Sequence, residues 1–184
     1  DTVQGTCIAA ESRGLRVTGS ELVGLVPLQA RLDAGIHFLR KQKRSIGIPE
    51  SEIIKIAVKS LGLDELAPFD PSQKIIEYKL REGKSDPLLE LSLRDFADET
   101  ASESPAPGGG SISAYAGALG VSLGTMVANL SAHKRGWDDR WNEVSDWAER
   151  GMSLQKRLLE LVDEDTRAFN RIMAAFGLPK SSKE

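Results

Sequence analysis

The spacing of apolar residues over the first eighty positions predicts a mixture of helices and short strands. From Leu28 to Lys43, apolar residues recur every three or four positions, as on one face of a helix. A second helix is predicted to begin at Pro49 and to end at Gly62, because glycine commonly closes a helix. Residues 15–18 and 74–80 are strand candidates, the latter because apolar and polar residues alternate there. We therefore expect an α+β fold in this part of the chain.

The pattern changes after residues 81–91, a short charged segment that we interpret as a linker between residues 1–80 and residues 92–184. In the second part Ser92 can cap a short helix. Helical spacing then extends from about Ser111 to Ala132 and from about Asp138 to Phe176. The predicted fold class is an α+β fragment followed by an all-α fragment.

Composition and charge restrict the function classes. The chain has 184 residues, of which 40% are apolar and 28% charged, and its formal net charge is −3. A surface that binds nucleic acid needs a basic excess, so we expect no nucleic-acid partner. Cys7 is the only cysteine, and the two histidines, His37 and His133, lie in different parts of the chain. We therefore expect neither an internal disulfide nor a bound metal.

The ends of the chain and its longest apolar stretch bear on location. We find no signal peptide and no unbroken apolar run of about 18–20 residues, the length that a membrane-spanning helix needs. The longest stretch, Ile112 to Leu130, is interrupted by glycines, serines and Asn129. We therefore expect a cytoplasmic protein without membrane insertion. Asp1 to Arg13 reads as the tail of a helix, so we also expect the chain to be a fragment of a longer protein.

A turn with three successive glycines, Gly108 to Gly110, lies directly before the helix predicted at Ser111. The first N–H groups of a helix lack partners within the helix, and the macrodipole makes this end positive. Such groups can receive a carboxylate, a phosphate or a polarised ring atom. The alternative is a plain connection between helices. A nucleotide phosphate loop fits poorly, because no Gly-Lys-Ser/Thr follows and no strand precedes.

The last predicted helix has an acidic residue, Asp165, on its apolar stripe. The other members of this stripe are Trp141, Val144, Ala148, Met152, Leu158, Leu161, Val162, Ala168, Phe169 and Ile172. A carboxyl group withdrawn from water is costly unless it is paired or protonated, and a protonated carboxyl group can serve as a general acid. The alternative is a structural pair with an Arg or Lys of a neighbouring helix. Asp163 and Glu164 fall largely on other faces, and we expect both to be solvated.

Two further features have both structural and functional interpretations. Gly117, Gly120 and Gly124 lie near one face of a helix, where each costs about 1 kcal/mol relative to alanine. We expect close approach of another helix on this face, within a bundle or across a subunit interface. His133 and Lys134 follow this helix, where the macrodipole favours cations, or where they could form a positive patch for an acidic ligand.

Several motifs resemble a known enzyme family. One set of motifs is similar to the cyclodeaminase/cyclohydrolase domain. It comprises residues 101–111, the Gly/Ala-rich helix, residues 161–169 and residues 178–180. A second set of motifs is similar to the end of the formiminotransferase domain, and it comprises residues 19–27, 61–64, 67–69 and 75–78. In this order, with a short linker, they resemble the formimidoyltransferase-cyclodeaminase family of histidine degradation. The implied fold is the end of an α/β formiminotransferase subdomain followed by the first helices of a helical-bundle cyclodeaminase domain.

The resemblance implies a folate-dependent enzyme of one-carbon metabolism with transferase and lyase activities. The transferase half would move the formimino group of formiminoglutamate to tetrahydrofolate. The cyclodeaminase half would convert 5-formimidoyltetrahydrofolate to 5,10-methenyltetrahydrofolate and ammonia. The resemblance further implies a polyglutamylated tetrahydrofolate as carrier, no metal, and a homo-oligomer formed through the helical domain.

The resemblance also implies roles for individual residues. Asp165 matches the family's catalytic aspartate, and the folate-site loop corresponds to Pro107, Gly108, Gly109, Gly110 and Ser111. His133 and Lys134 would meet the glutamate tail of the folate. The transferase's catalytic histidine has no counterpart here, so we expect this fragment alone to be inactive. Two alternatives stay open: a methenyltetrahydrofolate cyclohydrolase, and a helical dimerisation module without chemistry.

Overall fold

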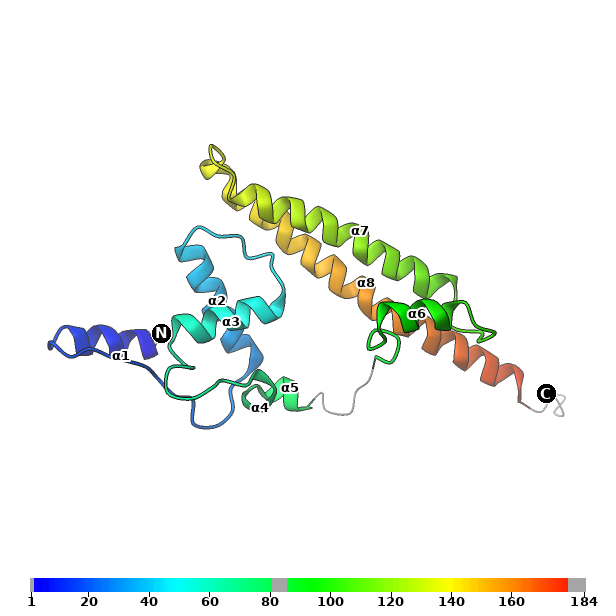
Figure 1. Ribbon diagram of the computed structural model, residues 1–184, viewed down its shortest axis with the longest axis horizontal. Helices are drawn as coiled ribbons and strands as arrows, with labels where there is room; N and C mark the ends of the chain where they lie inside the picture. The colour runs from blue at the N-terminus through cyan, green and yellow to red at the C-terminus, as the bar shows by residue number, and fades with distance from the viewer. Residues whose placement is uncertain (1, 81–85, 179–184) are drawn as a thin grey trace, which may run out of the picture. The chain divides into compact units, whose positions relative to one another are not determined.

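The computed structural model describes residues 2–80 and 86–178, and the regular structure in these residues is helical (Figure 1). The elements are α1 (Thr2–Glu11), α2 (Leu28–Lys41), α3 (Glu50–Ser60), α4 (Pro71–Lys74), α5 (Ile76–Leu80), α6 (Leu93–Thr100), α7 (Gly109–Ala132), the short 3-10 helix η1 (Asp138–Arg140) and α8 (Trp141–Phe176). The predicted helices of both parts are therefore present. Residues 81–85 of the predicted linker lie outside the described residues, whereas residues 86–91 are described.

The expectation of an α+β first part is wrong, because residues 2–80 contain no strand. Residues 15–18 have no regular structure, and the alternating segment 74–80 forms the end of α4 and all of α5. Sheet pairing in the described residues is limited to one parallel bridge between Val26 and Ile75. A strand needs a hydrogen-bonded neighbour along its length, and neither candidate has one here.

The helical conformation of α5 lets Glu77 satisfy the beginning of α2. Pro27 occupies the N-cap position of α2 and makes no side-chain hydrogen bond to the helix. The Leu28 N–H instead donates to Glu77 Oε2 over 2.7 Å. A carboxylate at a helix N-terminus also interacts favourably with the macrodipole. This tertiary cap explains why a segment with an alternating sequence is recruited into a helix.

The core of the first part lies between α2, α3 and the segments that flank them. One buried cluster contains Val26, Leu28, Ile54, Val58, Leu63 and Ile75, and a second contains Leu39, Ile46 and Ile53. Gly35 of α2 lies directly against the Ile53 backbone of α3, with no space for a Cβ atom. Gly62 follows α3 with a φ of +63°, the left-handed conformation expected of a residue that closes a helix.

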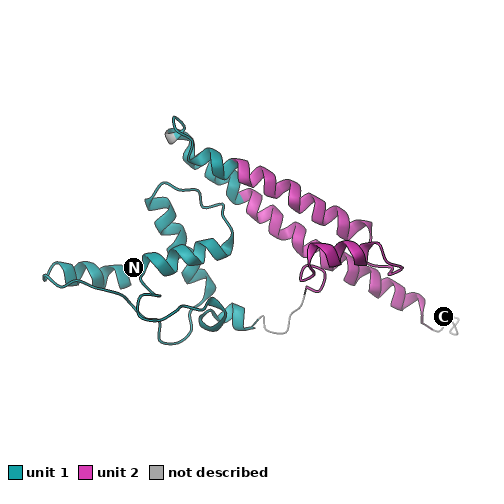
Figure 2. Ribbon diagram, in the orientation of Figure 1, with its two compact units in different colours: residues 1–84, 128–149 teal, residues 85–127, 150–184 magenta. Residues whose placement is uncertain are grey.

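The chain divides into two compact units (Figure 2). The first consists of residues 1–84 and 128–149, and the second of residues 85–127 and 150–184. In the second unit, α7 and α8 pack through small and polar residues. A Cβ atom built on Gly117 would make ordinary contact with Leu158, whereas Gly151 lies so close to Thr125 that a Cβ atom would overlap its side chain.

The short helix α6 also belongs to the second unit. Ser92 caps it as predicted, since its Oγ accepts the Asp95 N–H over 3.1 Å. Phe96 of α6 packs against Tyr115 of α7, with ring centroids 5.3 Å apart.

One long face of α7 is apolar and exposed. Its large side chains are Leu119, Leu123, Met126, Val127 and Leu130, all between 49% and 68% exposed. Nothing among the described residues lies within 4 Å of a Cβ built on Gly120 or Gly124. The described residues therefore come no closer than ordinary side-chain contact to Gly117, Gly120 or Gly124, and an approach across a subunit interface stays a prediction. By length and composition α7 is also apolar enough to cross a membrane, with a mean hydropathy of 1.3, although core helices pass the same test.

Candidate functional site

The site is built around the N-terminus of α7. The triple glycine predicted to precede the helix is partly absorbed into it, because α7 begins at Gly109. The Ile112 N–H donates to the Gly108 carbonyl over 3.1 Å, which continues the helical pattern back to the turn. Pro107 is buried and follows a cis peptide bond from Ala106. The proline side of the turn is therefore buried, whereas Gly109 is exposed.

Ser111 joins this turn to α8. Its N–H donates to Asp165 Oδ2 over 3.0 Å, and its Oγ lies 3.2 Å from the same oxygen. The Ser111 hydroxyl also donates to the Val162 carbonyl over 2.7 Å. A hydroxyl group has a single proton, so the shorter contact to Val162 uses it, and the N–H supplies the main bond to Asp165. Ser111 has no exposed surface.

Asp165 is half-buried on α8, facing the positive end of α7. This arrangement corresponds neither to full solvation nor to a pair with Arg or Lys. A carboxylate at a helix N-terminus gains about 0.3–1 kcal/mol from the macrodipole and a charge-assisted hydrogen bond to the free N–H. Both contacts from Ser111 use Oδ2, and the described residues make no hydrogen bond to Oδ1.

Gly110 explains why the two elements approach so closely. A Cβ atom built on this residue would overlap all three atoms of the Asp165 carboxylate group. By contrast, a Cβ on Gly108 or Gly109 meets nothing within 4 Å. Of the three glycines, Gly110 is needed for packing against Asp165, and the other two leave the backbone uncovered on the outer side of the turn.

Asp163 differs from its prediction. The sequence pattern indicated a solvated side chain, but Asp163 is only 2% exposed. Its Oδ1 accepts the Leu88 N–H over 3.2 Å, and its Oδ2 is buried without a hydrogen-bond partner among the described residues. The pattern failed because α8 buries two sides: one against α7, and another against the turn at residues 86–91.

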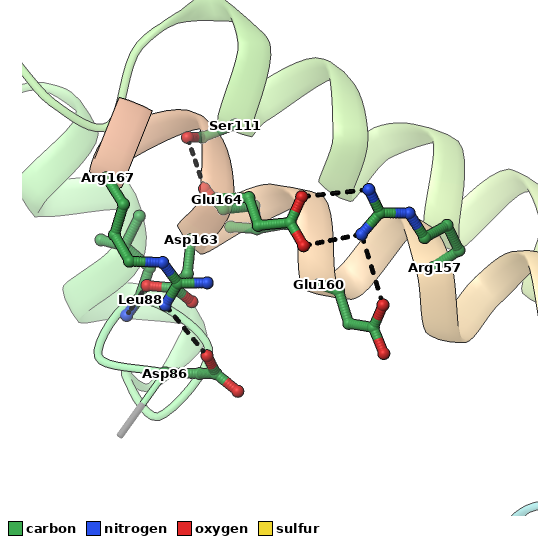
Figure 3. Close-up of polar contacts among 9 residues, drawn as sticks. Asp86, Leu88, Ser111, Arg157, Glu160, Asp163, Glu164 and Arg167 are labelled. Atoms are coloured by element: carbon green, nitrogen blue, oxygen red, sulfur yellow. Dashed lines mark hydrogen bonds and ion pairs between the residues drawn. The ribbon is translucent and has the colours of Figure 1, made fainter. Parts of the chain in front are cut away.

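Glu164 lies between these two aspartates and is paired along α8 (Figure 3). Arg157 donates to both of its carboxylate oxygens, over 2.7 and 3.0 Å. The Arg157 guanidinium, through these hydrogen bonds and its charge, lowers the pKa of Glu164 below its ordinary value. Both side chains are about half exposed, so the pair is a surface feature.

His133 and Lys134 belong to the first compact unit, whereas Asp165 belongs to the second. Both are exposed and follow the C-terminal end of α7, whereas Ser111 belongs to its first turn. A helix of 24 residues is about 36 Å long. The Lys134 Nζ lies 5.2 Å from the ring centroid of Trp137, a cation–π contact.

The described residues contain no group of three or more His, Cys, Asp or Glu side chains able to hold a metal ion. The chemistry that the local arrangement can support is proton transfer by Asp165 and binding of a polar group by uncovered backbone at Gly108 and Gly109.

Comparisons with known proteins match both parts of the chain. Residues 92–184 match the formiminotransferase-cyclodeaminase family, and residues 2–81 match the formiminotransferase domain. The formimidoyltransferase-cyclodeaminase of Rattus norvegicus is 41% identical over 176 residues, which are 95% of this chain and 32% of the rat protein. That of Gallus gallus is 41% identical over 179 residues, which are 97% of this chain and 33% of the chicken protein.

A third relative matches half of the chain. The methenyltetrahydrofolate cyclohydrolase of Methylorubrum extorquens is 34% identical over 93 residues, which are 50% of this chain and 45% of that protein. The chain spans about a third of the length of the formimidoyltransferase-cyclodeaminases that it matches.

Proposed function

The chain belongs to the formiminotransferase-cyclodeaminase family, and from this we propose that it is part of a folate-dependent enzyme of histidine degradation. In this proposal its second part carries out the cyclodeaminase reaction, from 5-formimidoyltetrahydrofolate to 5,10-methenyltetrahydrofolate and ammonia. Its first part belongs to the transferase, which moves the formimino group of formiminoglutamate to tetrahydrofolate. Support comes from the order of the two family matches, residues 2–81 and then 92–184.

The observation that carries the proposal is the hydrogen bond from the Ser111 N–H to Asp165 Oδ2. In the proposed reaction, N10 of the folate attacks the formimino carbon and its proton passes to the formimino nitrogen. The carbon–nitrogen bond to this amino group then breaks as the group takes a second proton and leaves as ammonia. Asp165 relays the N10 proton: its carboxylate, the form that the Ser111 N–H favours, accepts this proton through Oδ1 as general base and then donates it to the formimino nitrogen as general acid, and solvent supplies the second proton.

Backbone groups of the turn are proposed to orient the folate. The uncovered positions Gly108 and Gly109, beside Gly110 and Ser111, support contact with a flat ring or a carboxylate, since no side chain stands in the way. Pro107 would fix the turn from its buried side.

His133 and Lys134 are proposed to meet the glutamate tail of a polyglutamylated folate bound to a second copy of the chain. The length of α7 is the reason for a second copy, because His133 and Lys134 follow the C-terminal end of this helix, whereas Ser111 lies in its first turn. The apolar face of α7, defined by Leu119, Leu123, Met126, Val127 and Leu130, supports a homo-oligomer formed through the helical part. We further propose a cytoplasmic location, in keeping with the free Cys7.

A second candidate is hydrolysis of 5,10-methenyltetrahydrofolate, favoured by the similarity to a cyclohydrolase over 93 residues. 5,10-Methenyltetrahydrofolate is the product of the deamination and the substrate of the hydrolysis. Ammonia is released in the first reaction, whereas water is added in the second. The match of residues 2–81 to the formiminotransferase domain favours deamination.

The experiment gives the full-length protein 5-formimidoyltetrahydrofolate and measures ammonia together with 5,10-methenyltetrahydrofolate absorbance. Equal amounts of both products support the cyclodeaminase. The same protein is also given 5,10-methenyltetrahydrofolate. Consumption of this compound, with no ammonia released from 5-formimidoyltetrahydrofolate, would support the cyclohydrolase. A protein that binds no folate and forms neither product would instead be a helical interaction module.

A further inference from the structure

Asp163 is the most enclosed carboxylate near the site, yet the proposed reaction does not use it. The residue is 2% exposed, one carboxylate oxygen accepts a single backbone N–H, and the other has no hydrogen-bond partner among the described residues. A buried carboxylate satisfied in this partial way costs free energy that an apolar residue of similar volume would avoid. Such a group calls for an explanation beyond packing.

The partner of Asp163 is a turn in the segment between the two family matches. The Glu90 N–H donates to the Asp86 carbonyl over 3.1 Å, which closes one helical turn. Pro87 has no N–H, so Leu88 offers the first free donor of this turn, and Asp163 accepts it. One turn further along α8, Arg167 Nη1 pairs with Asp86 Oδ1 over 3.4 Å. We call these two contacts the α8 anchor.

The α8 anchor and the Ser111 contacts hold the same turn of α8 from two sides (Figure 3). On one side Ser111 binds the Val162 carbonyl and Asp165. On the other side Asp163, next to Val162, binds Leu88. Because α8 is a single rigid element here, rotation of this turn about the helix axis would break one set of contacts or the other. The direction of the Asp165 carboxylate is therefore fixed by both.

We propose that Asp163 is a positioning residue, which orients Asp165 by fixing the turn at Asp86–Glu90 against α8. This inference rests on the proposed cyclodeaminase function. It assigns a role in the reaction to residues 86–90, which lie outside both family matches. A misplacement of a reacting group by about 1 Å can cost as much as a hundredfold in rate, so a positioning residue affects kcat without touching the substrate.

The test compares three variants of the full-length protein. Asp163→Leu removes the acceptor and keeps a similar volume, whereas Asp163→Asn keeps an oxygen that can accept the Leu88 N–H. Leu88→Pro removes the same hydrogen bond from the other partner, at a position in the first turn where proline is tolerated. Glu160→Gln is the matched control, because Glu160 is an exposed carboxylate on α8 outside these contacts. Each variant is assayed for kcat and KM of ammonia release, formimino transfer and thermal unfolding.

For Asp163→Leu and Leu88→Pro we expect kcat of ammonia release to fall about tenfold or more with KM changed less than about twofold. Formimino transfer stays at the parent level, and Asp163→Asn recovers most of kcat. A structural role alone would lower transfer, ammonia release and the unfolding temperature together, and would overturn the proposal. If Asp163→Leu does not fold, Leu88→Pro decides by the same criteria. Parent-level kcat in both overturns the positioning role, whereas parent-level ammonia release in Asp165→Asn overturns the proposed function itself.

Discussion

The Ser111 N–H donates to Asp165 Oδ2 over 3.0 Å, a contact between residues 54 positions apart in the chain. It joins the first turn of α7 to the last third of α8, and it places a carboxylate at the positive end of a helix. A sequence pattern can suggest each partner separately. Their hydrogen bond is the feature that turns two suggestions into one site.

The first prediction concerns Asp165. Asp165→Asn keeps the size of the side chain and an oxygen for the Ser111 N–H, but it cannot donate a proton as a carboxylic acid. We expect ammonia release by the full-length protein to fall by about 10²–10⁴-fold, the usual contribution of a general acid. Formimino transfer, measured on the same preparation, stays unchanged. Glu160→Gln is again the control, and parent-level ammonia release in Asp165→Asn would contradict the role.

Gly110 gives a prediction about packing. Gly110→Ala places a methyl group where the Asp165 carboxylate lies, so we expect a loss of about 1–3 kcal/mol in the free energy of unfolding and loss of ammonia release. The comparison is Gly109→Ala, one residue earlier, where a Cβ meets nothing within 4 Å. This variant should be neutral or more stable by up to about 1 kcal/mol. Equal stability of the two variants in urea denaturation would show that the turn does not pack as described.

A second close contact can be tested by rescue. In Gly151→Ala the new methyl group overlaps the Thr125 side chain, so we expect destabilisation by about 1–3 kcal/mol. Thr125→Ala removes the obstructing atoms, and the double variant should recover part of the loss. The double-mutant cycle measures this coupling, and simple additivity of the two effects would argue against contact between α7 and α8 at this point.

The pair of Arg157 and Glu164 predicts a pH dependence. The Arg157 guanidinium, through its hydrogen bonds and charge, lowers the pKa of Glu164 in the folded protein below the ordinary value of a glutamate. The contribution of this pair to the free energy of unfolding is therefore present above the ordinary pKa of a glutamate. It is lost as the pH falls through the lower pKa of Glu164 in the folded protein. In an NMR titration, the Glu164 carboxyl resonance should move at lower pH than in Arg157→Gln. A titration that is the same in both proteins would show that the pair does not form in solution.

The exposed face of α7 predicts an interface between copies. Leu123→Glu places a charge on this face, and we expect it to shift the full-length protein towards a smaller assembly in light scattering. Lys156→Glu, at an exposed position of α8, should leave the assembly unchanged. If the parent protein is a monomer, or if both variants keep the parent mass, the face has another occupant.

The sequence predicted the helices well because their signals are local. Ser92 caps α6, Gly62 closes α3 with a positive φ, and the three- and four-residue spacing of α8 passes through Asp165. The strand predicted at 74–80 failed for a tertiary reason. Its alternation is only a few residues long, and a helix there allows Glu77 to cap α2. A cap supplied by a residue 49 positions away leaves no signal in the local pattern.

Asp163 and Asp165 of α8 show the same limit within the candidate site. The spacing of Asp165 agrees with the stripe that packs on α7, so a local pattern is enough to predict its place on α8. Asp163 was misjudged because its surroundings depend on Leu88, 75 positions away, and a single apolar stripe cannot describe a helix buried on two sides. A signal was nevertheless present, since Pro87 interrupts the charged linker and begins a turn whose first free N–H requires an acceptor.

The main bond to Asp165 comes from the peptide group of residue 111, and this has a consequence for how the site can vary among related sequences. Every amino acid except proline carries a backbone N–H. A substitution at position 111 can therefore preserve the hydrogen bond to Asp165, provided that the new side chain is small enough. The vulnerable neighbour is position 110, where even the smallest chiral residue collides with the acid. Sequences that keep the acid but acquire a side chain at 110 should therefore have lost this geometry, whatever else they retain.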